Sequence, residues 1–283
     1  MSNELHVITD DELHNLQRIE LEMLIEIDRI CRKYDIKYSI DGGTLLGAAR
    51  HKGFIPWDDD ADVVILRHEY AKFKRACRKE LDKDRFFLQD YKTDPEYRWG
   101  WAKMRRNGTS YIRAGQENQK YHDGIFLDIF VVDNVPDGWL ARRLHFLACF
   151  VIRKGLYSVV GKDNEANPLY RNIYRLMSRI PKDTYFKARN TLAKALHGRR
   201  TELISHYMYQ YPKRCKFGLP RECFDEMTDM EFEGYTLRGF KNYDLYLTRL
   251  YGDYMKLPPI EQRVPKMEIT GLGLVEPILP PIK

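Results

Sequence analysis

Residues 41–64 read DGGTLLGAARHKGFIPWDDDADVV, and this stretch decides the fold. The alternating residues 38–41 before it predict a short strand, Gly42 and Gly43 break that strand, and residues 44–50 predict a short helix. A second strand is predicted over residues 61–66. Glycines let backbone N–H groups approach a ligand, and the N-terminus of a helix favours an anion. The stretch therefore predicts a strand, turn and helix able to hold a phosphate group.

Four carboxylates crowd into residues 58–62, namely Asp58, Asp59, Asp60 and Asp62. Because like charges repel, such a cluster is costly unless cations neutralise it. Asp60 and Asp62 alternate at the start of the predicted strand, which places both side chains on one face. Mg²⁺ is held in proteins by a few carboxylates together with phosphate oxygens. The spacing predicts a metal site, and the alternative is an acidic, solvated turn.

Asp128 is an isolated acid in an apolar run, residues 124–132, GIFLDIFVV. A carboxylate in a buried strand is costly unless it is paired or binds a metal. Asp128 therefore predicts the third acid of the site, on a strand next to that of Asp60 and Asp62. The alternative is that alternation points Asp128 to a solvated face of the sheet.

The rest of the chain predicts an α/β (α+β) protein with a mixed sheet. Residues 9–12, TDDE, form a capping-box pattern that opens a long helix. A charged helix is expected over residues 69–81, and strands over residues 86–90, 99–104 and 109–113. We expect one catalytic domain over residues 1–283, with a core at about 20–135, a helical insertion without strands at about 139–210, and a C-terminal segment, about 211–283, that packs back on the core.

The composition is that of a soluble globular protein, 43% apolar and 31% charged. Its net charge of +6, from 47 basic and 41 acidic residues, suits phosphate-bearing or anionic-surface partners and falls short of a nucleic-acid-binding signature. Five cysteines at wide spacing indicate neither a zinc site nor a disulfide framework. The acidic N-terminus predicts no signal peptide, and the longest apolar run, residues 144–152, is too short to span a bilayer. We therefore expect a cytoplasmic chain.

The predicted insertion combines aromatic and basic residues, among them Trp139, Arg142, Phe146, Phe150 and Arg153. A basic helix packed on the domain is the favoured interpretation. The alternative is an interfacial helix that touches the inner face of the cell membrane and brings the protein to a lipid-linked acceptor.

The Gly-Gly turn, the acid pair and the later acid together resemble the nucleotidyltransferase fold. Residues 41–64 are similar to the signature of the LicD/fukutin family, whose bacterial members transfer phosphocholine from CDP-choline to cell-surface glycans. Residues 103–109 (KMRRNGT), 124–130 and 251–255 (YGDYM) resemble other motifs of that family. The resemblance covers about residues 20–135 and 231–265. Ala61 and Val132 depart from the family pattern, and neither is at a ligand position.

By that resemblance, Asp60, Asp62 and Asp128 are the catalytic, metal-binding acids and Asp58 and Asp59 support them. The resemblance also implies a set of residues at the nucleotide phosphates, namely Gly42, Gly43, Thr44, Arg50, His51, Lys103 and Arg105. His51 has the alternative of an exposed loop residue. Lys103 and Arg105 have the alternative of a surface pair.

The resemblance implies a transferase that depends on Mg²⁺, or on Mn²⁺ in its place. It would move phosphocholine or a similar group from CDP-choline or a related CDP-linked donor to a glycan, a lipid-linked glycan, a teichoic-acid precursor or a lipopolysaccharide, and release CMP. No nucleic-acid partner is expected. Two alternatives stay open: a nucleotidyltransferase acting on a small molecule or sugar phosphate, and a non-catalytic module that binds nucleotide or glycan. A choline group would need aromatic faces, and Trp57, Trp99 and Trp101 are candidates.

Overall fold

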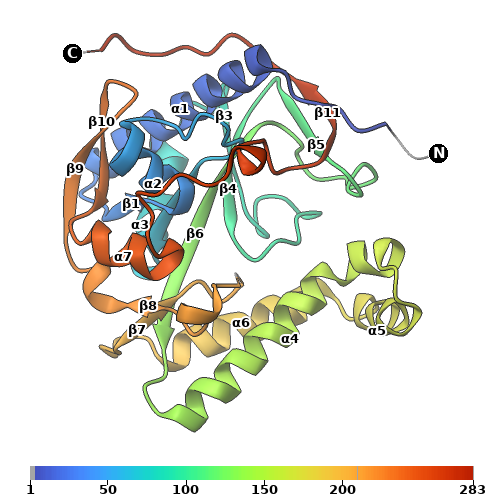
Figure 1. The fold of residues 1–283 in the computed structure, drawn as a ribbon. Helices are drawn as coiled ribbons and strands as arrows, with labels where there is room; N and C mark the ends of the chain where they lie inside the picture. The colour runs from blue at the N-terminus through green and yellow to red at the C-terminus, as the bar shows by residue number, and fades with distance from the viewer. Residues whose placement is uncertain (1–3, 209, 283) are drawn as a thin grey trace.

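The computed structural model describes residues 4–208 and 210–282, which form a mixed sheet with helices around it (Figure 1). The helices are α1 (Asp10–Lys33), α2 (Gly42–His51), α3 (Arg67–Glu80), α4 (Trp139–Asn164), α5 (Pro168–Ser178), α6 (Lys182–Ala195) and α7 (Tyr243–Tyr251), with short 3-10 turns η1 (Lys213–Cys215), η2 (Arg221–Cys223) and η3 (Ile260–Gln262). The strands are β1 (Tyr38–Ile40), β2 (Asp62–Leu66), β3 (Phe86–Gln89), β4 (Ala102–Arg106), β5 (Ser110–Arg113), β6 (Phe126–Val135), β7 (Leu203–Ser205), β8 (Leu219–Pro220), β9 (Met227–Phe232), β10 (Tyr235–Phe240) and β11 (Ile269–Gly273).

A mixed sheet forms the centre of the molecule, with strand order β1-β2-β6-β4-β3, and β7 and β8 extend it from β6. The pair β2 and β6 is parallel and the other neighbours are antiparallel. In the parallel pair Asp62 lies opposite Asp128, and in the antiparallel pair Lys103 of β4 also lies opposite Asp128. The α+β class expected from the sequence is confirmed, and the central register brings two of the predicted acids together.

Helix α1 begins with the predicted capping box, because the Thr9 hydroxyl accepts the Glu12 N–H and the Glu12 carboxylate accepts the Thr9 N–H. Its apolar stripe is fully buried in the main core, and includes Leu16, Ile19 and Met23. Helices α1 and α3 both contact the sheet and each other. The C-terminal segment packs back as expected, since β10 contacts β1 and β11 pairs with β5.

Several expected boundaries of helices and strands are wrong, and one strand is missing from the prediction. Helix α2 begins at Gly42 and not at Thr44, because the Leu45 N–H donates to the Asp41 carbonyl over 3.0 Å and closes the first turn. Strand β4 begins at Ala102, three residues later than expected. The insertion contains a strand, β7, which pairs with the end of β6. Three residues are too few to display alternation, so only the pairing with β6 reveals this strand.

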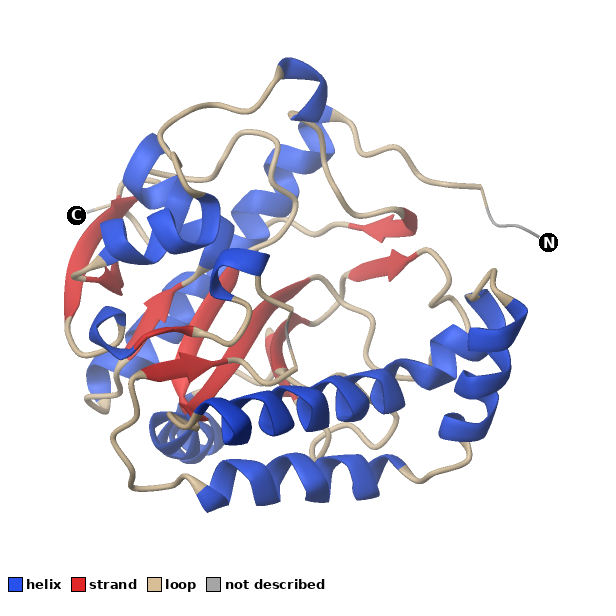
Figure 2. Ribbon diagram, turned by 60° about the horizontal axis from the view of Figure 1, so that its bottom comes forward, coloured by secondary structure: helices blue, strands red, loops and turns tan. Residues whose placement is uncertain are grey.

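The insertion lies beside the sheet as a layer of helices, which the chain enters from the end of β6 (Figures 1 and 2). Helix α4 contacts α5 and α6. Among the described residues, α4 is a helix long and apolar enough to cross a membrane by length and composition, although 44% of its most apolar stretch is buried inside the protein. Arg153 and Lys154 interrupt the apolar run of residues 144–152 without ending the helix, so α4 is longer than that run.

Candidate active site

The Gly-Gly turn is fastened to the start of β2. The Asp41 N–H donates to the Asp62 carbonyl over 2.9 Å, and the Thr44 hydroxyl accepts the Asp62 N–H over 2.9 Å. A Cβ on Gly43 would lie 2.4 Å from Oδ2 of Asp58, and a Cβ on Gly42 would lie 3.3 Å from Oδ2 of Asp62. The glycines therefore make room for the carboxylates of the acid cluster, and Thr44 positions the strand that carries Asp62.

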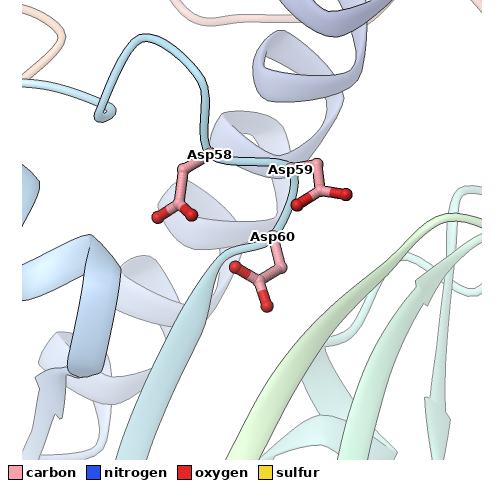
Figure 3. A group of neighbouring side chains, drawn as sticks. All are labelled: Asp58, Asp59 and Asp60. Atoms are coloured by element: carbon pink, nitrogen blue, oxygen red, sulfur yellow. The ribbon is translucent and has the colours of Figure 1, made fainter. Parts of the chain in front are cut away.

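Asp58, Asp59 and Asp60 have carboxylate oxygens within 4.8 Å of one another, and Figure 3 shows them along the segment that leads into β2. Asp59 is 2% exposed, and it accepts the N–H groups of Lys266 (3.2 Å) and Met267 (3.0 Å) and the hydroxyl of Tyr111 (3.3 Å). Asp59 therefore anchors the C-terminal segment beside the site.

Asp62 and Asp128 lie side by side on adjacent parallel strands. Oδ1 of Asp62 is buried and has no hydrogen-bond partner within residues 4–208 and 210–282. Oδ1 of Asp128 accepts the indole N–H of Trp101 (2.8 Å) and the Lys103 ammonium (2.5 Å). Trp101 and Lys103 therefore fix the Asp128 side chain, and both contacts use one of its two oxygens.

A cavity of about 450 Å³ opens at these acids. Asp58, Asp59 and Asp60 line it together with Asp62 and Asp128. The other lining residues are one more acid, Asp41, and glycine, aromatic, apolar and basic residues, which include Gly42, Gly43, Trp101, Arg113, Phe130, His206, Tyr211, Tyr246, Tyr251 and Lys266. The predicted acids Asp60, Asp62 and Asp128 thus share one cavity, although the tightly spaced group in the described residues is Asp58, Asp59 and Asp60. Asp60 belongs to both sets.

Burial and mutual repulsion make these carboxylates hard to ionise. Burial raises the pKa of Asp60 to about 7, and the charges of Asp58, Asp59 and Asp128 add to this effect. Burial raises the pKa of Asp58 to about 6, although Lys266 opposes the shift. The pKa of Asp62 is raised well above its ordinary value by burial and by Asp60. A divalent cation would relieve this repulsion, so the side chains fit a metal site.

Glu20 of α1 is an acid that the sequence analysis does not identify. It is 1% exposed, and burial together with the charges of Asp60, Asp59, Asp58 and Asp128 raises its pKa well above the ordinary value. The sequence could have identified Glu20 as a buried acid, because it interrupts the apolar stripe of α1 between Leu16 and Leu24. Glu20 therefore belongs to the same buried cluster of repelling acids as the aspartates.

Lys103 and Arg105 lie inside the protein, each 3% exposed, so the alternative of a surface pair is wrong. Burial lowers the pKa of Lys103 to about 7, and the attraction of Asp128 opposes this shift. Arg105 donates to the side chain of Gln89 (2.8 Å) and to the Gly124 carbonyl (2.5 Å). Neither residue lines the cavity at the acids. Lys103 holds Asp128, and Arg105 fixes the chain around β6.

Arg50 and His51 also lie outside the residues that line this cavity. Nε of Arg50 donates to Nε2 of His51 (2.9 Å), and Nη1 donates to the Tyr254 carbonyl (2.8 Å). The basic residues that do line the cavity are Arg113 and Lys266, together with His206, and the sequence analysis names none of them. Lys266 lies in an aperiodic segment, so no local pattern predicts its role. Only the contact of that segment with Asp59 places Lys266 at the cavity.

The family model described as "LicD/FKTN/FKRP, nucleotidyltransferase domain" matches residues 35–147, which contain all six aspartates that line the cavity, Asp41, Asp58, Asp59, Asp60, Asp62 and Asp128. The chain is 30% identical over 269 residues to the lipopolysaccharide cholinephosphotransferase LicD of Haemophilus influenzae, a match that covers 89% of this chain and 95% of that protein. Short matches to uncharacterized proteins of Rickettsia typhi and Rickettsia prowazekii are 41% identical over 54 residues and 44% identical over 48 residues, and cover 18% of each of those proteins.

Proposed function

Because this chain belongs to the LicD family, we propose that it is a phosphotransferase that moves phosphocholine from a CDP-linked donor to a hydroxyl of a cell-surface glycan or its lipid-linked precursor, and that it releases CMP. The relative from Haemophilus influenzae, which matches over nearly its whole length, is named as a cholinephosphotransferase acting on lipopolysaccharide. This relationship supports the class of reaction and a glycan as acceptor.

The observation that carries the proposal is the pairing of Asp62 with Asp128 in a cavity that Asp58, Asp59 and Asp60 also line. We propose that Asp60, Asp62 and Asp128 hold a divalent cation, Mg²⁺ or Mn²⁺. The raised pKa values of Asp60 and Asp62 and the unpartnered Oδ1 of Asp62 fit that role. When bound, such a cation would neutralise diphosphate charge and favour departure of CMP.

The carboxylates around the proposed cation site would also bind and activate the acceptor hydroxyl. Asp62 or Asp128 would orient the sugar hydroxyl and accept its proton, while the hydroxyl oxygen forms a bond to the β-phosphorus of the donor and the bond from that phosphorus to CMP breaks. Trp101 and Lys103 keep Asp128 in place throughout.

Aromatic side chains in the same cavity suit a choline head group. The ring centroids of Trp101 and Phe130 are 5.9 Å apart, and both residues line the cavity with Tyr251. A quaternary ammonium group donates no ordinary hydrogen bond and is attracted to aromatic faces. The exposed π surfaces thus favour choline over the polyol head groups ribitol and glycerol.

We expect the purified protein, incubated with Mg²⁺, CDP-choline and a bacterial surface glycan, to release CMP and to label the glycan with phosphocholine. CDP-ribitol and CDP-glycerol should yield CMP at a rate at least about tenfold lower, since the aromatic surface contributes roughly 1–2 kcal/mol to a desolvated cation only. Chromatography of the nucleotide products measures both rates. Release of pyrophosphate from CTP or ATP, with no CMP from any CDP-linked donor, would support nucleotidyl transfer instead.

Cation binding is expected to depend on pH. A folded-state pKa of about 6 for Asp58 and about 7 for Asp60 means that below pH 6 both hold protons that a cation must displace. We expect Mg²⁺ at about 100 times its Kd to raise the melting temperature by about 5 °C at pH 8. The rise should be less than half as large at pH 5.5. Differential scanning fluorimetry with Mg²⁺ or EDTA measures it, and an equal rise at both pH values would contradict these carboxylates as ligands.

A further inference from the structure

The helical insertion carries apolar side chains on its outside. On α4 these residues are Leu140, Leu144, Leu147 and Val151, which are 56%, 59%, 56% and 47% exposed. Their spacing of four, three and four residues places them on one face of the helix. The buried residues of α4, which include His145, Cys149, Ile152 and Leu156, occupy the other side. Helix α4 therefore has two apolar faces, and the protein covers one of them.

Helix α5, which packs on α4, repeats this arrangement. Leu169, Ile173 and Leu176 recur at helical spacing and are 67%, 41% and 62% exposed, whereas Tyr174 is its buried residue. The apolar stripe of a surface helix in a soluble protein usually faces the core. On α5 this stripe faces outward. We call these seven residues of α4 and α5 the outer face.

The charge of the whole chain is concentrated in the same segment. Residues 139–181 contain eight arginines and lysines and two acids, which leaves 39 basic and 39 acidic residues for the rest of the chain. The net charge of +6 therefore resides in the segment that bears the outer face. Arg143 and Arg175 are exposed on the two helices, and the Arg143 guanidinium lies 4.9 Å from the centroid of the Trp139 ring. Apolar residues flanked by arginine, lysine and tryptophan are typical of a helix that lies in a membrane interface.

We propose that the outer face of α4 and α5 binds the surface of an anionic lipid bilayer. The complementary charge supports a lipid surface, and a second copy of the chain is disfavoured because a symmetric contact would bring two segments of +6 together. An interfacial position also agrees with the burial of one side of α4 against α5 and α6, which a helix spanning the bilayer alone would lose. This inference goes beyond the proposed reaction and does not depend on it.

Helix α4 also lies close to the cavity at the acids. A second cavity of about 240 Å³ lies between the core and α4, and its lining includes Trp101, Lys154 and Tyr157. Trp101 lines the cavity at the acids as well. Helix α4 therefore lies between this second cavity and a bilayer bound at the outer face.

Flotation with lipid vesicles tests the proposal. We expect the full chain to bind phosphatidylcholine vesicles that contain phosphatidylglycerol, and to bind pure phosphatidylcholine vesicles weakly. The Leu144→Ser, Leu147→Ser, Leu176→Ser variant should partition at least about tenfold less, since each leucine loses its buried area in the interface. The variant Arg143→Gln, Arg175→Gln should lose about fivefold per arginine on anionic vesicles only.

A matched control replaces three residues of similar exposure in the C-terminal segment, Ile260→Ser, Val264→Ser and Ile278→Ser, which are 76%, 53% and 61% exposed in the native chain. This control should bind vesicles as the native chain does, and circular dichroism should give the same helix content for every variant. No binding of the native chain to anionic vesicles, or equal binding by the leucine variant, would overturn the proposal. A dimer that the leucine changes dissociate, without vesicle binding, would assign the outer face to a second copy and would also overturn it.

Discussion

Replacing Asp60 with asparagine is expected to lower the rate of CMP release by about 10³-fold, the size typical of losing one electrostatic contact to a transition state. Asp60 lies both in the group of closely spaced acids and in the set of Asp60, Asp62 and Asp128 that the sequence predicts. Its loss therefore removes a ligand under either arrangement. The Mg²⁺-induced rise in melting temperature should disappear with it, which separates loss of cation binding from a merely slower reaction.

The same variant is expected to be more stable than the native chain in EDTA at pH 8. The pKa of Asp60 is about 7 in the folded protein and about 3.8 in an unfolded chain, so the folded state disfavours the ionised form. This lowers the free energy of unfolding as the pH rises from about 4 through 7, and asparagine removes the effect. Below pH 4 the two proteins should have similar melting temperatures. Retained activity within twofold, or a retained response to Mg²⁺, would contradict the role of Asp60.

Asp59→Asn is the matched control for this prediction. Asp59 is adjacent in sequence and its oxygens accept hydrogen bonds from Lys266, Met267 and Tyr111. Its replacement should weaken the attachment of the C-terminal segment and lower the melting temperature, and it should leave a response to Mg²⁺ through Asp60. Opposite signs of the stability change in the two variants would distinguish the anchoring acid from the proposed ligand.

The second large effect concerns Lys103, whose replacement by methionine should destabilise the protein by about 3–5 kcal/mol. The Lys103–Asp128 ion pair is buried, and the side chains are 4% and 9% exposed. Without Lys103, the Asp128 carboxylate keeps the Trp101 N–H but has no buried cation to compensate it in EDTA. Urea denaturation of the metal-free protein at pH 6, below the pKa of about 7 at which Lys103 loses its charge, measures the change. The double variant Lys103→Met, Asp128→Asn should recover most of the loss, because no buried charge then remains unpaired.

The pair Lys241–Glu226 provides a comparison at a similar distance of 2.6 Å with side chains 64% and 69% exposed. Lys241→Met should leave the denaturation midpoint nearly unchanged, since solvent screens an exposed pair. A change for Lys103→Met as small as that for Lys241→Met would mean that Asp128 does not depend on Lys103. In that case the account of how Asp128 is held in the site would be wrong.

Local patterns predict the part of the fold that surrounds the acids. Alternation places Asp62 at the start of β2 and Asp128 within β6, and the glycines mark the turn into α2. These features depend on residues that are neighbours in sequence, so local sequence patterns predict them. Strand β7 is missed because its three residues are extended only through pairing with β6.

Contacts between distant segments decide the rest of the site, and the sequence does not predict them. The family resemblance predicts Lys103 at the nucleotide phosphates, whereas β4 places it opposite Asp128. Glu20 reaches the aspartates because α1 crosses the sheet, and Lys266 reaches the cavity because Asp59 holds its N–H. Arg50 matches a family motif and instead donates to His51 and to the Tyr254 carbonyl. Each case depends on where a second segment lies in space.

The mass balance of donor and acceptor tests the central claim most directly. CDP-choline, Mg²⁺ and a purified glycan are incubated with the native chain or with Asp60→Asn, and mass spectrometry follows the nucleotide and the glycan together. The account predicts one phosphocholine group on the glycan for each CMP released by the native chain, and neither product from Asp60→Asn above background. A glycan that gains CMP, or phosphocholine transfer that persists unchanged in Asp60→Asn, would contradict it.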